Sequence, residues 1–121
     1  MSQWDVLTDL RQIIALDEEG AALALPLCSM SLDEIKIRLR DGVSPNDIRV
    51  TKAAAGLAYY KLIVQRLAGA EAVTSFKAGD VTVSKSSAAA LEIASKIRDE
   101  NLLGALPLMK DEEFVFRQVG I

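Results

Sequence analysis

Hydrophobic residues in the first part of the chain recur with the period of an amphipathic helix. Leu7, Leu10 and Ile14 are spaced by three and four residues. They follow Ser2 and Asp5, whose separation is that of a capping box at a helix N-terminus. The pattern predicts a capped helix that ends near the acidic run DEEG at 17–20.

The next segment is apolar, but its pattern is interrupted. Pro26 breaks the run AALALPLCSM, which favours a short helical or irregular piece packed on the core. Ser31 and Glu34 then repeat the capping-box spacing, and Gly42 is suited to stop a helix. We therefore expect a separate short helix over about residues 32–41.

The string SPND at 44–47 is the sharpest local signal in the chain. Ser44 is a good N-cap, Pro45 suits the first helical position, and Asp47 places negative charge at the positive end of the helix. The spacing predicts a long helix from Pro45 to a stop at Gly69. At about 1.5 Å per residue, its roughly 24 residues would span about 36 Å.

After Gly69 the pattern changes to one typical of strands. Val73, Phe76, Val81 and Val83 are β-favouring and flank the turn-like string KAGD, in which Gly79 tolerates a positive φ. This predicts a β-hairpin over about residues 73–83. Serines at 84–87 then offer caps for an alanine-rich helix that must stop before the proline at 107, and FVFRQV at 114–119 indicates a closing strand.

These elements predict an α+β fold that is mostly α. It has four to five helices, with the hairpin and the C-terminal strand forming a small antiparallel sheet. The 121 residues form a single domain, since two cores would each be too small, with a helical part over 1–69 and a hairpin-helix-strand part over 70–121.

The composition excludes most common types of active site and metal site. The chain has no histidine, and Cys28 is its only cysteine, so the usual zinc ligands and nucleophile-base pairs are missing. Cys28 sits among apolar residues, where a thiol packs as a small hydrophobe. We therefore expect no enzyme activity, catalytic residue, cofactor, metal or small-molecule substrate.

Charge and hydropathy restrict the partners. Fourteen basic and seventeen acidic residues give a net charge of −3, which argues against a dedicated duplex-DNA binder held by phosphate contacts. We expect no sequence-specific nucleic-acid partner. The longest uncharged stretch, residues 20–32, is too short to span a bilayer. The N-terminus lacks a basic segment followed by an apolar run, so we expect the cytoplasm rather than export.

The charges are segregated along the chain. Residues 1–35 carry a net charge of −6, residues 36–66 carry +5, and the remainder carries −2. The simpler interpretation is that complementary elements meet within one molecule. The alternative is a head-to-tail contact in which Arg49, Lys52 and Arg66 face the acidic third of a neighbouring copy, an arrangement that can close into a ring.

Small and aromatic residues on the predicted long helix suggest where it packs. The run AAAG at 53–56 lets another helix approach closely, and packing within the chain is favoured over an oligomer contact. Tyr59 and Tyr60 point about 100° apart, so at most one should be fully buried and the other is available to an interface.

The C-terminal half resembles a known class of proteins. The string SFKAGDVTVSKSS, the helix AAALEIASKIRDENLLGALPLM and the closing EEFVFRQV are similar to small morphogenesis proteins of tailed phages and prophages, near the head-tail connector or head-completion group. The resemblance covers about residues 72–119. It implies a subunit that forms a ring beneath the portal, with the hairpin reaching a neighbouring subunit.

Together these considerations predict a structural protein, a connector-like subunit that joins the capsid portal to the tail by self-association into a ring. It would lie in the bacterial cytoplasm during assembly and in the virion neck afterwards. An adaptor that binds a host protein through an exposed apolar helix face is the alternative, and an enzyme using carboxylates and a metal is the least favoured. The predicted contact residues are Arg49, Lys52, Tyr59, Arg66, Phe76, Lys77, Gly79 and Asp80.

Overall fold

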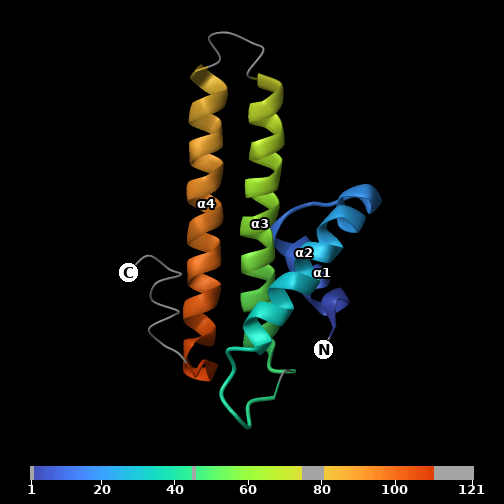
Figure 1. Cartoon of the computed structure of the whole chain (residues 1–121), viewed down its shortest axis with the longest axis vertical. Helices are drawn as coiled ribbons and strands as arrows, with labels where there is room; N and C mark the ends of the chain where they lie inside the picture. Colours follow the sequence, from blue (N-terminus) through green and yellow to red (C-terminus); the bar gives the residue numbers. More distant parts are fainter. Residues whose placement is uncertain (1, 45, 75–80, 111–121) are drawn as a thin grey trace.

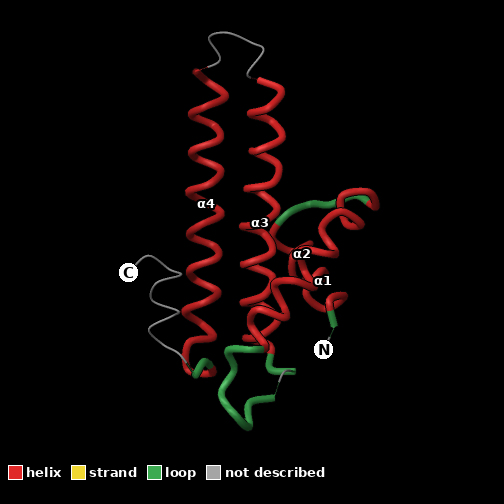
Figure 2. Tube along the Cα trace, in the orientation of Figure 1, coloured by secondary structure: helices red, strands yellow, loops and turns green. Residues whose placement is uncertain are grey.

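The computed structural model describes the backbone of residues 2–44, 46–74 and 81–110, and the side chains of 2–44, 46–68 and 88–110. Within these residues the chain forms four α-helices and one short 3₁₀ helix. In order they are α1 (Gln3–Ile13), α2 (Glu18–Lys36), α3 (Ile48–Thr74), α4 (Val81–Ala105) and η1 (Leu106–Leu108). The predicted α+β class is wrong, because the described residues contain no strand (Figure 2).

The long helix α3 is the centre of the fold. It packs on α1 and α2 on one side and runs alongside α4 on the other (Figure 1). Figure 1 also shows α3 and α4 extending together beyond the layer formed by α1 and α2. The core therefore sits where α1, α2, the first half of α3 and the C-terminal end of α4 with η1 meet, and the other ends of α3 and α4 project from it.

The predicted N-terminal helix is confirmed as α1, with an earlier end than expected. The Asp5 carboxylate accepts a hydrogen bond of 3.0 Å from the Ser2 backbone N–H, as the capping spacing requires. Leu7 and Leu10 are buried on the face that meets the core. The helix ends at Ile13, a few residues before the acidic run.

Helix α2 corrects two predictions. The structure has one helix from Glu18 to Lys36, where we expected an irregular segment followed by a separate helix over about 32–41. Asp17 caps it, accepting from the Gly20 N–H at 2.7 Å, and Ser31 lies buried in its interior instead of serving as a cap. A proline inside a helix costs about 3 kcal/mol, and burial of an apolar face at helical spacing offsets that cost. The buried apolar residues of α2 are Ala21, Ala24, Cys28, Leu32 and Ile35.

The long helix is confirmed, with shifted ends. It begins at Ile48, after Asp47 rather than after Ser44, and continues past Gly69 to Thr74. Gly42, expected to stop the preceding helix, lies in the loop between α2 and α3 with a φ of +86°, a conformation that glycine adopts readily.

The predicted β-hairpin is wrong where it can be compared with the structure. Val73 lies in α3, and Val81 and Val83 lie in α4. β-propensity is a weak preference, and here the two helices continue through these residues. Residues 75–80 and the predicted strand at 114–119 lie outside the described residues.

Helix α4 ends before Pro107, as the sequence predicts. Helix α4 stops at Ala105, and Pro107 falls in η1, as predicted. An isolated antiparallel bridge between Leu39 and Met109 then joins this end of the chain to the loop after α2. The Arg40 N–H donates to the Leu108 carbonyl at 2.8 Å, so residues far apart in sequence are fastened together at the base of the fold.

Candidate protein-binding surface

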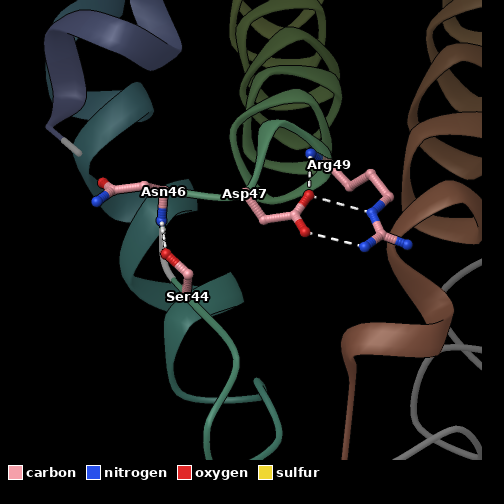
Figure 3. Close-up of polar contacts among 4 residues, drawn as sticks. All are labelled: Ser44, Asn46, Asp47 and Arg49. Carbon is pink, nitrogen blue, oxygen red and sulfur yellow. Dashed lines mark hydrogen bonds and ion pairs between the residues drawn. The ribbon is translucent and has the colours of Figure 1, made fainter.

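The predicted contact residue Arg49 is engaged within its own chain at the start of α3. The Asp47 carboxylate accepts from the Arg49 backbone N–H at 2.9 Å and from its guanidinium Nε and Nη2 at 3.1 and 2.9 Å (Figure 3). These hydrogen bonds from Arg49 hold the pKa of the Asp47 carboxyl below its usual range. Figure 3 shows Ser44 nearby, where its hydroxyl accepts from the Asn46 N–H at 3.2 Å.

Lys52 and Arg66 are the other predicted cations of this helix, and Lys52 interacts with an acidic residue of the same chain. Burial raises the pKa of Asp9 on α1, and the positive charge of Lys52 opposes that rise. Arg66 borders a shallow depression of about 430 Å³ together with Leu16 and Asp17. Lys52 thus has an acidic neighbour, Asp9, that the sequence places far away.

A direct ion pair joins the acidic and basic thirds of the chain. Lys61 Nζ on α3 lies 2.9 Å from the Glu34 carboxylate on α2. Together with the interaction of Lys52 with Asp9, this pair supports the simpler interpretation of the charge segregation, in which complementary elements meet within one molecule. The head-to-tail charge contact stays a prediction.

Neither adjacent tyrosine is fully buried. Tyr59 is half-buried and packs against the core. Tyr60 is also half-buried, and the Arg98 guanidinium on α4 lies over its ring, 4.2 Å from the centroid. The four remaining predicted contacts, Phe76, Lys77, Gly79 and Asp80, lie outside the described residues.

The structure reveals an apolar surface that the sequence reasoning missed. Leu23 and Met30 on α2 and Ile37, the residue that directly follows the helix, are 66%, 53% and 64% exposed and follow one another at intervals of seven residues. Seven residues make close to two helical turns, so the three side chains lie in one line. We call this line the α2 stripe. The seven-residue repeat is visible in the sequence. The prediction of two separate segments around Pro26 placed its members on different elements, so they were not recognised as one line.

A groove lies between α1 and α2, and none of the stripe residues lines it. Helices α1 and α2 border a depression of about 480 Å³, lined in part by Trp4, Leu7, Ala22 and Leu25. Trp4 is 60% exposed at its edge. Arg11 and Glu18 also line the groove, which therefore combines apolar and charged groups.

The described residues offer little reactive chemistry. Cys28 is fully buried in α2, and burial raises the pKa of its thiol to about 11, so the thiol stays protonated near neutral pH. No group of three or more potential carboxylate or thiol metal ligands occurs within the described ranges. A search of the same residues finds no helix with the length and hydrophobicity needed to cross a membrane.

Comparison with known proteins identifies no relative of this chain. No protein-family model, no curated protein and no solved structure matches this chain. The resemblance to phage connector proteins therefore rests on the sequence strings within residues 72–119.

Proposed function

We propose that this chain is a structural protein that works by binding other polypeptides, as a connector-like subunit between the portal and the tail of a phage or prophage. The observation that carries the proposal is the α2 stripe. Large apolar side chains in one exposed line are typical of interaction surfaces, whereas isolated exposed ones are common and uninformative. Leu23 and Met30 on α2 and Ile37 directly after it are more than half exposed, and the other face of the helix is already buried in the core.

The shape of the molecule is compatible with such a role. The α3–α4 pair extends past α1 and α2 as a paired arm (Figure 1). Gly56 packs against Asn101, and Tyr60 against Arg98, so specific contacts hold the two helices together. A subunit of this form acts through its shape and its contacts with other subunits, which is what a ring between portal and tail requires. Its place would be the cytoplasm during assembly and the virion neck afterwards.

The test is addition of the purified full chain to portal particles. We expect bound subunits in a defined ring, counted by native mass spectrometry or seen by electron microscopy. The double variant Leu23→Ser/Met30→Ser should bind at least tenfold more weakly, whereas Ile93→Ser, which alters an exposed apolar residue on α4, should bind normally. A chain that stays monomeric and never joins portal particles would contradict the proposal.

An adaptor that binds a host protein is the second candidate, and the same stripe favours it. Partner grooves recognise helices through apolar anchors repeated every three, four or seven residues. Affinity purification from an infected or induced host separates the candidates. Recovery of one identified host protein and no virion component, lost in the Leu23→Ser/Met30→Ser variant, would favour the adaptor.

A further inference from the structure

We propose that the bond between Asp41 and Gly42, in the loop from α2 to α3, is a site of covalent self-modification, where the main chain cyclises to a succinimide and reopens in part as an isoaspartyl linkage. In the whole sequence Asp41 is the only Asp or Asn residue followed directly by glycine. A side chain on the following residue hinders approach of its amide nitrogen to the carboxyl carbon, and glycine has none. The proposal goes beyond the connector role and does not depend on it.

The backbone around this bond forms an open turn. The Val43 N–H donates to the Arg40 carbonyl at 3.2 Å, which makes Asp41 and Gly42 the central residues of a β-turn. Both central residues are exposed, and a Cβ added to Gly42 would meet nothing within 4 Å. A ring can therefore close at this bond without displacing neighbouring groups.

Neither reacting group is engaged elsewhere in the part of the chain that the structure describes. No hydrogen bond there uses the Gly42 N–H or the Asp41 carboxylate. Asp47, in the same loop, differs in two ways. Its carboxylate accepts hydrogen bonds from the Arg49 backbone and guanidinium, and the residue that follows it is the β-branched Ile48. The structure therefore favours reaction at Asp41 over reaction at Asp47.

The reaction needs only water as a co-reactant. The Gly42 amide nitrogen attacks Cγ of the protonated Asp41 carboxyl; a C–N bond forms, the nitrogen loses its proton, and the carboxyl hydroxyl leaves with a proton as water. Addition of water at Cγ breaks the new bond and restores aspartate. Addition of water at the main-chain carbonyl carbon of Asp41 breaks the original peptide bond instead. The main chain then runs through Cβ and Cγ, with no net change in composition and no electron transfer.

The product would alter the loop where it is fastened to the end of the described chain. Arg40 directly precedes the reacting residue, and its N–H donates to the Leu108 carbonyl at 2.8 Å while its Nε donates to the Met109 carbonyl at 2.6 Å. An isoaspartyl linkage adds a carbon atom to the main chain within the turn that closes between Arg40 and Val43. We therefore expect the isomerised chain to unfold at a lower urea concentration than the unmodified chain.

Incubation of the folded full chain in water enriched in heavy oxygen tests the site. Each opening of the ring transfers an oxygen atom from the solvent to residue 41, whether aspartate or isoaspartate results. After weeks at neutral pH and physiological temperature, digestion in ordinary water and peptide mass spectrometry should find the label and isoaspartate at Asp41. Absence of both from that residue in the folded chain would overturn the proposal, and so would equal labelling at Asp47.

Two matched variants complete the experiment. Asp41→Glu would need a larger ring and should carry no label above background at residue 41. Asp33→Glu changes an exposed carboxylate within α2 and should leave the labelling of Asp41 unchanged. Loss of the label in both variants would contradict the assignment to Asp41.

Urea unfolding of fresh and aged samples tests the consequence. The midpoint of the natural chain should fall with age, whereas that of Asp41→Glu should stay constant. An equal fall in both proteins would contradict the effect assigned to Asp41. An unchanged midpoint in a natural chain that carries isoaspartate at Asp41 would contradict the expected loosening of the loop.

Discussion

Gly56 on α3 faces Asn101 on α4 so closely that a Cβ added to the glycine would lie 2.9 Å from the Asn101 Cβ. The neighbouring alanines at 53–55 are buried, so this part of α3 offers only small groups to its surroundings. The absence of a side chain at residue 56 therefore sets how near the two long helices come. The sequence-based expectation that the AAAG run serves packing within the chain is confirmed.

Substitution of Gly56 should loosen the helix pair. Gly56→Ala gains about 1 kcal/mol in helix propensity, but its methyl group collides with a Cβ that cannot rotate away, at a typical cost of 1–3 kcal/mol. We expect a net loss of about 1 kcal/mol in the free energy of unfolding, measured by urea denaturation. Gly104→Ala is the control: an added Cβ there meets nothing within 4 Å, so that variant should gain up to about 1 kcal/mol. Equal effects at both sites would contradict the close contact.

The ion pair between Glu34 and Lys61 should make a small, measurable contribution to stability. The pair is partly exposed, so a coupling of about 0.2–1 kcal/mol is expected from a double-mutant cycle of Glu34→Gln and Lys61→Met. The coupling should weaken in 1 M salt. Zero coupling at low salt would contradict the interpretation that this ion pair helps to join the acidic and basic parts of the chain.

Ser31 is a buried polar group whose removal should stabilise the protein. Its hydroxyl oxygen is buried and has no hydrogen-bond partner in the structure. Burial of an unsatisfied hydroxyl costs about 1–3 kcal/mol, so Ser31→Ala should raise the free energy of unfolding by about 1 kcal/mol. Ser31→Thr retains the hydroxyl and adds a methyl group to a filled site, so it should be destabilising. A loss of stability in Ser31→Ala would show that the hydroxyl is bonded.

The buried thiol of Cys28 predicts a loss of stability at high pH. Its pKa rises from 9.0 to about 11 on folding. Below pH 9 the thiol is protonated in both states, so its full contribution is present; as pH rises from 9 to 11, ionisation favours the unfolded chain. The loss approaches about 2–3 kcal/mol above pH 11. Between pH 9 and 11 the free energy of unfolding should fall more steeply with pH in the natural chain than in Cys28→Ala. Equal dependence on pH in the two proteins would contradict the prediction.

The contact between Arg98 and Tyr60 should couple α4 to α3. The guanidinium lies 4.2 Å from the ring centroid and also donates to Asp99 through Nε at 2.9 Å, which fixes its orientation. A double-mutant cycle of Arg98→Ala and Tyr60→Leu should give about 0.5–1 kcal/mol of coupling. Arg98→Lys should recover only part of it, since an ammonium lacks the planar stacking surface.

Local signals along the chain were reliable where short-range chemistry decides the outcome. The capping pair Ser2 and Asp5 and the stop before Pro107 are both found in the structure. Asp47, not Ser44, caps the long helix, because the Asp47 carboxylate is placed to accept from the Arg49 N–H at 2.9 Å. Sequence reasoning thus placed this boundary to within a few residues.

Long-range packing decided what those signals could not. Pro26 and the capping spacing at Ser31 both indicated a break in α2, yet the buried face that includes Ala24, Cys28 and Ile35 keeps one helix through them. The same burial leaves Leu23, Met30 and Ile37 on the opposite side. The candidate surface followed only once the helix was known to be continuous.

By itself the sequence determined that the N-terminal half is helical, where its long helix lies and that reactive side chains are scarce. These properties depend on residue type and on near neighbours in the chain. Only the tertiary structure decided that the valines at 73, 81 and 83 are helical, that Glu34 meets Lys61, and that α2 presents an apolar line outward. The physical reason is that a β-branched residue or a proline shifts local preference by at most a few kcal/mol. In α2, burial of a helix face that includes Ala24, Cys28 and Ile35 outweighs such a preference.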